Sequence, residues 1–309
     1  MLALLSGILA YLTLFSGTVG LSWSDVFCEG ASVKSRIFWD IRVPRLVAAV
    51  LSGAALSVAG LSLQTLFRNP LAGPFVLGIS SGASLGVALS LLAGFSFGRF
   101  GVLTAASVGA LAVTAVVMAV ASRFKNSTVL LIVGLLTGYF IDALVSLMIV
   151  SGDAESLKVY VSWGMGSFGR LTFDGMGIFA LAVVAGVLLI LFSMRYLNAV
   201  RMGDDFASGL GVNVRLCRNL VLLGASLLAG ASTAFCGPVA FVGIAVPHLA
   251  FMLFKTGNHR VLLPGSALCG VVLCLAASQF ATIPLNAVLS LVGVPVVLWV
   301  IVRGRGVRE

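Results

Sequence analysis

The chain has 309 residues, of which 60% are apolar and only 9% are charged. A soluble domain carries about 25% charged residues, and a chain with so few could not cover a water-exposed surface, so the composition excludes a soluble globular protein. The net charge of +9 is split among short segments and forms no continuous basic patch, which argues against nucleic-acid binding and favours a chain embedded in a lipid bilayer.

Long uncharged segments divide the chain into about ten predicted transmembrane helices. A helix needs about 20 apolar residues to cross the hydrocarbon core, and these segments lack the two-residue alternation of membrane β-strands. In chain order, the predicted spans cover residues 2–21, 45–67, 76–94, 101–121, 129–150, 174–194, 219–235, 239–254, 262–280 and 284–302. We therefore expect an all-α polytopic membrane protein, with one transmembrane domain over residues 1–309.

The basic residues between the spans predict the orientation of the chain. The first segment has no basic region before it and no convincing cleavage site, so we expect it to be retained as a span. Ten spans place both termini on one side, and a cytoplasmic N-terminus puts most of the cations inside, as the positive-inside rule requires. Those left outside are Lys34, Arg36, Arg42, Arg45, Arg99, Lys158 and Arg170. We expect a bacterial inner-membrane protein with both termini in the cytoplasm.

The sequence contains no motif that would support catalysis. None of its lysines is preceded by glycine, so the phosphate-binding motif G-x-x-x-x-G-K-[ST] is absent. The two histidines, His248 and His259, have no spacing that would hold a metal together with a nearby carboxylate, and the cysteines form no C-x-x-C pair. We expect no enzymatic activity, and no cofactor or metal bound by the chain itself.

Two features inside the predicted spans leave alternatives open. Gly78, Gly82 and Gly86 recur every four residues, and such a stripe lets helices approach closely; packing within one subunit is the favoured interpretation. Asp142 is the single acid in a span, and it could be functional or could hydrogen-bond a neighbouring helix. An ion-coupled secondary transporter that uses Asp142 is therefore an alternative function, although that class predicts several intramembrane charges.

Two proline-bearing loops interrupt the spans, at 68–74 and 236–248. Non-helical backbone at membrane depth is tolerated where it lines a cavity or is buried in protein, so these loops are typical of a transporter. Their motifs resemble the permease subunit of type II ABC importers, the family that carries iron-siderophore, haem and cobalamin substrates. The resemblance covers nearly the whole chain, and its blocks occur in family order at 41–56, 64–83, 236–248, 259–265, 283–284 and 293–295.

The resemblance implies three groups of site residues. A cytoplasmic coupling segment that docks on a separate ATPase is matched by Gly203, Asp204, Asp205, Phe206, Ala207, Leu210 and Gly211. A cytoplasmic gate that closes the translocation path is matched by Asn69, Leu71, Ser127 and Thr128. Arg42 and Arg45 match outward-facing arginines that pair with acids of a periplasmic binding protein. The simpler alternatives are an ordinary solvated loop and arginines that anchor a span end at the interface.

The resemblance also implies how the chain works. Two copies would form a pore, two ATPases would bind below it, and a binding protein would deliver a metal chelate for import by alternating access. One departure stands out: residues 277–284 are uncharged where the family has an Asp and an Arg in the last outer loop, so docking there is weaker, made by other residues, or lost. A structural or assembly subunit would leave the gate and coupling motifs unexplained. The sequence does not specify which chelate is carried.

Overall fold

The computed structural model describes residues 1–16, 19–27, 32–95, 101–123, 127–280 and 282–305. These residues form helices joined by turns, with no strand among them, so the all-α prediction is confirmed. Within these described ranges, six helices are long and apolar enough to cross a membrane: α4 (Val43–Phe67), α6 (Gly101–Arg123), α7 (Ser127–Ser151), α9 (Phe173–Phe192), α12 (Val214–Cys236) and α14 (His259–Ser278). Three shorter apolar helices, α1 (Leu2–Phe15), α5 (Ile79–Leu91) and α13 (Val242–Phe254), match further predicted spans, and the last span is matched by the apolar stretch Leu285–Trp299 of α15 (Leu285–Arg305).

Several boundaries differ from the predicted ones. The third span, predicted from residue 76, begins at Ile79, because Pro74 starts a short 3-10 turn, η2 (Pro74–Leu77), and Gly78 then takes the left-handed conformation at φ 72°. The helix that contains α4 starts earlier than residue 45, since α3 (Val33–Arg36) and the π-turn η1 (Ile37–Arg42) lead directly into it. Hydropathy marks the apolar part of a helix, whereas the helix itself continues into the polar interface.

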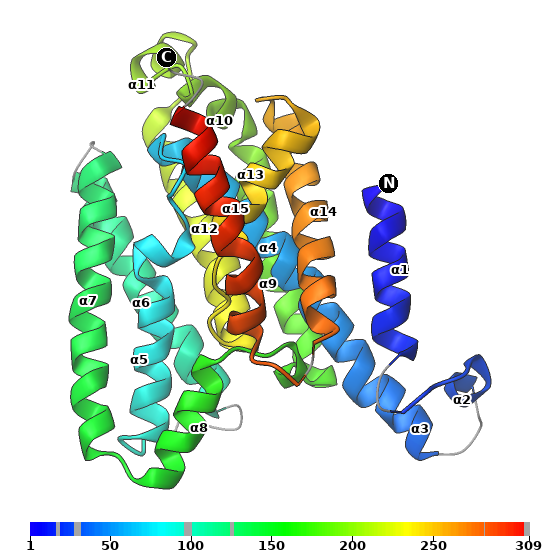
Figure 1. Cartoon of the computed structure of the whole chain (residues 1–309). Coiled ribbons are helices and arrows are strands. Elements are labelled where there is room, and N and C mark those ends of the chain that lie inside the picture. Colours follow the sequence, from blue (N-terminus) through cyan, green and yellow to red (C-terminus); the bar gives the residue numbers. More distant parts are fainter. Residues whose placement is uncertain (17–18, 28–31, 96–100, 124–126, 281, 306–309) are drawn as a thin grey trace.

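Short helices occupy the two ends of the bundle (Figure 1). One end holds α10 (Met194–Val200) and α11 (Asp204–Gly209), and the other holds α2 (Trp23–Phe27), α3 and α8 (Ala154–Gly164). Asp153 caps α8 by accepting hydrogen bonds from the backbone N–H groups of Glu155 and Ser156, at 3.0 and 2.9 Å. The start of α1 and the end of α15 lie toward the end that carries α10 and α11 (Figure 1).

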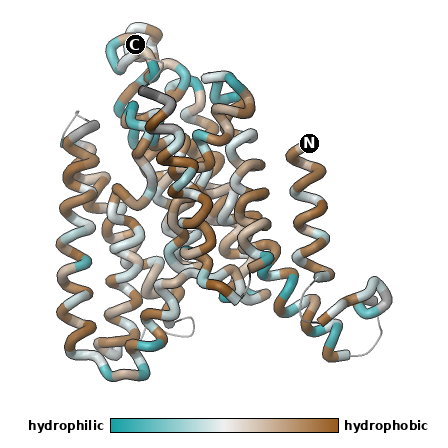
Figure 2. Tube along the Cα trace, in the orientation of Figure 1, coloured by the Kyte–Doolittle hydropathy of each residue, from teal (hydrophilic) through white to brown (hydrophobic). Residues whose placement is uncertain are grey.

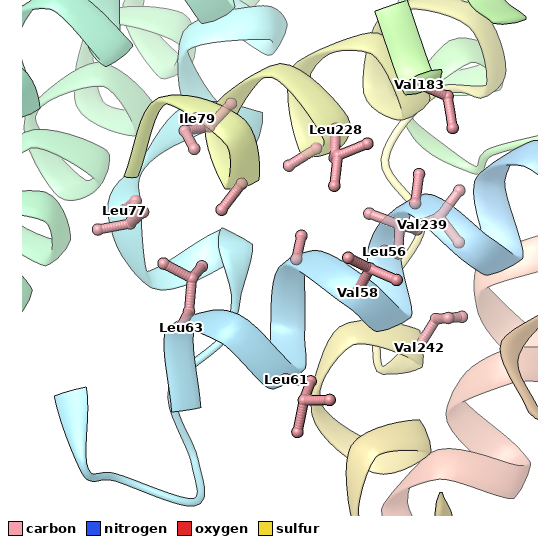
Figure 3. Packing of buried hydrophobic residues seen from close by; sticks show 14 of the residues in the cluster. Leu56, Val58, Leu61, Leu63, Leu77, Ile79, Val183, Leu228, Val239 and Val242 are labelled. Atoms are coloured by element: carbon pink, nitrogen blue, oxygen red, sulfur yellow. The ribbon is translucent and has the colours of Figure 1, made fainter. Parts of the chain in front are cut away.

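Helix α4 is the centre of the bundle and packs against α9, α12, α13 and α14. Its close approaches are made by glycines: a Cβ added to Gly53 would overlap the Gly270 backbone of α14, and one added to Gly60 would overlap the Gly243 backbone of α13. Figure 3 shows this core, in which apolar side chains of α4 lie between α12 and α13. Small residues therefore set the spacing of the central helices, as expected for helix association in lipid.

Helices α5, α6 and α7 lie side by side at one edge of the molecule (Figure 1). Gly82 approaches the Gly109 carbonyl of α6, and Gly86 approaches that of Ala105, so closely that neither position has room for a Cβ. The predicted glycine stripe thus packs within one subunit, and that interpretation is confirmed.

Hydrophobic residues make up most of the length of the helices, while hydrophilic residues gather toward the two ends of the bundle (Figure 2). Helix α7 is attached by a narrow strip that includes Gly134 and Gly138, and Phe140 on its other side is 66% exposed. Helix α15 is similar, with Leu291 76% exposed. Such surfaces need lipid or another membrane subunit as their neighbour.

Candidate functional site

The first two predicted gate residues lie in the loop that follows α4. Arg68 ends α4 in the left-handed conformation, and the side-chain oxygen of Asn69 accepts a 2.9 Å hydrogen bond from the Leu71 backbone N–H. Leu71 is 45% exposed, so its side chain is available to meet another surface. Ser127 and Thr128 begin α7, but their side chains lie outside the described residues.

Two side chains join α13 to the end of α4 and to the loop that follows it. The His248 imidazole donates from Nε2 to the Pro70 carbonyl at 2.9 Å, and the Gln64 amide donates from Nε2 to the Ile244 carbonyl at 3.1 Å. Both residues belong to the motif blocks of the sequence, yet these two hydrogen bonds were not predicted. Their partners are backbone carbonyls, which carry no side-chain signal in a sequence.

The second interrupted span is also held by hydrogen bonds from elsewhere in the chain. After α12 ends at Cys236, Gly237 turns at φ 77° and the backbone is non-helical until α13. Asn286 of α15 accepts a 2.9 Å hydrogen bond from the Ala240 N–H and donates from Nδ2 to the Gly164 carbonyl at 3.2 Å. Asn286 therefore satisfies backbone groups that a broken helix leaves open.

The predicted coupling segment forms α11 and the residues on either side of it, and it follows α10 at the end of the molecule where α9 ends and α12 begins (Figure 1). Gly203 caps α11 at φ 117° and Gly211 follows it at φ 77°, conformations that only glycine adopts without strain. The two glycines fix where the short helix starts and how the chain leaves it.

The predicted coupling residues divide between the interior and the surface. Ala207 is fully buried, whereas Asp205 is exposed. The apolar side chains of Phe206 and Leu210 are 45% and 62% exposed, and Met202 beside them is 71% exposed. Large apolar side chains exposed on a segment outside the spans favour contact with another protein.

One predicted coupling residue is held by an ion pair that the sequence did not indicate. Asp204 Oδ2 accepts a 2.8 Å hydrogen bond from Arg218 Nη2 of α12, and the Arg218 side chain is only 8% exposed. Burial, together with the charge of Asp204, raises the pKa of the adjacent Tyr196 hydroxyl on α10 to about 12, so this group stays neutral at physiological pH. The pair attaches α11 to a membrane-spanning helix. The predicted span begins at residue 219, so the sequence places Arg218 among the cations of the preceding loop. Helix α12 already begins at Val214, and Arg218 is therefore inside it.

The two outer arginines have different environments. Arg42 is 7% exposed, and its guanidinium donates to the backbone carbonyls of Leu14, at 2.7 Å, and of Val19. These bonds anchor the chain that follows α1, and they leave Arg42 less available for docking than the sequence predicts. Arg45 is only partly buried and lies beside Gly169 at a small recess of about 40 Å³. Residues from the uncharged loop at 277–284 line the same recess.

Asp142 lies on the exposed side of α7, rather than buried against a neighbouring helix. Its backbone carbonyl accepts a 2.7 Å hydrogen bond from the Ser146 hydroxyl within the same helix. The neighbouring Tyr139 is 63% exposed, so the carboxylate is on a surface that lipid or another subunit must cover.

A comparison over nearly the whole length of the chain identifies its family. A model of the FecCD transport family matches residues 4–303. The chain belongs to the FecCD transport family. Membership in this family of permeases makes the chain a transport subunit rather than an enzyme.

Full-length relatives of this FecCD permease agree with that assignment. It is 35% identical to the hemin transport system permease protein HmuU of Yersinia pestis, over 95% of this chain and 91% of that one. It is 34% identical to the vitamin B12 import system permease protein BtuC of Vibrio cholerae, over 93% of this chain and 89% of that one. A solved inward-facing structure of a metal-chelate type ABC transporter matches with a TM-score of 0.85 at 30% identity, covering 98% of this chain and 97% of that one. None of these relatives supports the ion-coupled alternative.

Proposed function

We propose that this FecCD permease moves a metal chelate, such as haem, cobalamin or an iron-siderophore, from the periplasm to the cytoplasm by alternating access. The observation that carries the proposal is that nearly the whole chain, 95% and 93% of it, aligns with permeases named for hemin and vitamin B12. The chain is about equally identical to these two relatives, which are named for different chelates, so the proposal names only the substrate class. ATP hydrolysis takes place in two separate ATPase subunits, and residues 1–309 act as one permease domain.

The translocation path lies between two copies of the chain. Support comes from α7 and α15, whose apolar faces are more exposed than those of the central helices. A closed two-fold arrangement would bury the same surface on both copies. Asn69 and Leu71, with Ser127 and Thr128 at the start of α7, form the gate at the inner end of this path.

The end of the bundle that carries α10 and α11 faces the cytoplasm. The supporting observation is the arginine-rich sequence at this end, which follows the positive-inside rule. In this orientation both termini are cytoplasmic, α11 meets the ATPase through Phe206 and Leu210, and Arg45 faces the binding protein.

We expect Arg45→Glu to weaken binding-protein docking by at least about tenfold at low salt, because like charges across an interface cost several kcal/mol. The loss should shrink as ionic strength rises, since salt screens exposed charges. Arg42→Glu should instead reduce the thermal stability of the subunit, because a carboxylate would face the Leu14 and Val19 carbonyls in place of a donor. Affinity measured on immobilised permease complex, together with thermal melting, separates the two effects. If both variants lost the same affinity and kept their stability, Arg42 would be a docking residue like Arg45.

The driving force tests the proposed function itself. We expect Asp142→Asn to keep most of the wild-type uptake, because an exposed carboxylate on α7 has no part in a transport cycle driven by ATP. Uptake of the radiolabelled chelate into vesicles that contain ATP should also survive an uncoupler that collapses the ion gradients. Normally expressed Asp142→Asn protein without uptake, combined with uncoupler-sensitive wild-type transport, would refute the ABC mechanism.

A further inference from the structure

A recess of about 510 Å³ lies where the polypeptide leaves one span and enters another. It is lined by Met194, Arg195, Asn198, Arg201, Gly257, Asn258 and Arg260. Helix α9 ends at Phe192 and α14 begins at His259, and both helices are long and apolar enough to cross a membrane. The recess is therefore at the level where the hydrocarbon core gives way to lipid headgroups, whichever way the protein is inserted.

The recess is strongly basic. Arg195, Arg201 and Arg260 are all exposed, and no acidic residue is among the lining residues. In the part of the chain that the structure describes, the ion pairs are Lys34–Asp25 and Arg218–Asp204, so the acids of this subunit do not neutralise these three arginines. Three cations that converge without a counter-charge are arranged to bind an anion.

One of the three guanidinium groups is held in place by its surroundings. Arg201 donates from Nη1 to the Gly257 carbonyl, and its guanidinium carbon lies 5.7 Å from the centre of the Phe251 ring. A Cβ on residue 257 would overlap the Arg201 guanidinium, so the Arg201 side chain can lie here only because residue 257 is glycine. The cation–π contact with the Phe251 ring further stabilises this position of the Arg201 guanidinium.

The floor of the recess is also ordered by hydrogen bonds. The side-chain oxygen of Asn198 accepts from the His259 backbone N–H at 2.9 Å, and its Nδ2 donates to Asn258 at 3.4 Å. Asn258 in turn caps α14 by accepting from the Arg260 N–H at 3.0 Å. The arginines thus surround a fixed polar floor at the N-terminus of a 20-residue helix, whose dipole also favours an anion.

Exposed apolar residues close to the lining residues along the chain, or in contact with one of them, indicate what kind of anion fits. Phe192 at the end of α9 is 78% exposed, Phe251 beneath Arg201 is 44% exposed, and Val261 beside Arg260 is 43% exposed. An anionic ligand with an apolar tail would place its phosphate among the arginines and its tail along these span ends. Arginine binds phosphate oxygens through paired hydrogen bonds, and basic recesses between spans are suited to anionic lipid headgroups.

We propose that Arg195, Arg201 and Arg260 form a binding site for the headgroup of an anionic phospholipid. The lipid would bridge α10, which leads into the coupling segment, and the start of α14. The proposal concerns a different surface from α11, where Phe206 and Leu210 are exposed for the ATPase.

The test uses the assembled importer, purified in detergent and stripped of lipid. Phosphatidylglycerol and phosphatidylcholine with identical acyl chains are added separately, and thermal stabilisation and lipid retained per permease are measured. We expect stabilisation by phosphatidylglycerol alone, and about fivefold weaker binding in Arg195→Gln or Arg260→Gln, since one basic residue near a membrane contributes about 1 kcal/mol. Gly257→Ala should weaken binding without changing the net charge, because it displaces Arg201.

Arg123→Gln is the matched control, since Arg123 is another exposed arginine, at the end of α6 and outside the recess. It should bind phosphatidylglycerol like the wild type. If Arg123→Gln weakened phosphatidylglycerol binding as much as the recess variants do, the effect would come from the net charge of the protein, and the proposal would be wrong. Inorganic phosphate that stabilises the protein as well as phosphatidylglycerol does would show a free-anion site instead. Recess variants that keep the lipid but release the ATPase would assign the surface to the ATPase.

Discussion

Asp205→Arg combined with Gly209→Trp is expected to abolish ATP-driven uptake while leaving the permease folded. Asp205 is exposed, and a Cβ at Gly209 meets nothing within 4 Å, so the subunit itself has room for both changes. The new side chains project from α11 beside Phe206 and Leu210, on the surface proposed to meet the ATPase. A tryptophan and a reversed charge would prevent α11 from packing against the ATPase. Without that contact, the nucleotide-driven movement of the ATPase is no longer transmitted to the gate.

The measurements are co-purification of the ATPase with the permease and stimulation of ATP hydrolysis by the binding protein in reconstituted vesicles. Both should fall to the level seen without permease. Gly177→Trp provides the matched control, because Gly177 is also exposed with nothing within 4 Å, but lies near the start of α9, whereas α10 and α11 follow its end. Full ATPase binding by the double variant would show that α11 is an ordinary solvated loop.

Gly60→Ala is expected to destabilise the protein severely, although alanine normally favours a helix over glycine by about 1 kcal/mol. Gly60 is in the buried interior of α4, and an added Cβ would overlap the Gly243 carbonyl of α13. The obstacle is backbone rather than a flexible side chain, so α4 and α13 must separate. Overpacking of a core costs about 1–3 kcal/mol, and here the movement would also disturb the Gln64 hydrogen bond that joins α4 to α13.

Thermal melting of the purified permease, with expression level recorded alongside, measures this effect. Gly7→Ala is the control: Gly7 lies in α1, where a Cβ meets nothing within 4 Å, and the melting temperature should be unchanged or slightly higher. If Gly60→Ala melted like the wild type, the close contact between α4 and α13 would not exist in the folded protein.

These two predictions depend on different kinds of information. The coupling variants follow from a sequence motif, and the structure adds that Asp205 is exposed and that a Cβ at Gly209 meets no other atom within 4 Å. The Gly60 variant depends on the structure alone, because the partner of Gly60 is a backbone carbonyl on another helix. A sequence contains many glycines in spans, and most of them could face lipid without consequence.

The sequence by itself determined the class of the protein and the ten apolar helices. The physical reason is that a bilayer offers no hydrogen-bond partners, so any apolar segment long enough to cross it must be helical, and the segment's own residues reveal this. Motif blocks in order along the chain were also enough to indicate the permease family and the coupling and gate segments. These signals are local in the sequence and do not depend on how the helices pack.

Only the tertiary structure decided which side of each helix is buried and which distant groups meet. Arg42 and Arg45 are close in sequence, yet Arg42 turns inward to the chain after α1 and Arg45 borders a small recess. Arg195 and Arg260 are far apart in sequence and share one recess because α10 lies against the start of α14. Hydropathy measures the transfer of a whole segment into lipid and is nearly the same for every rotation of a helix about its axis. The rotation is set by close contacts between small residues, and those contacts exist only once the helices have packed.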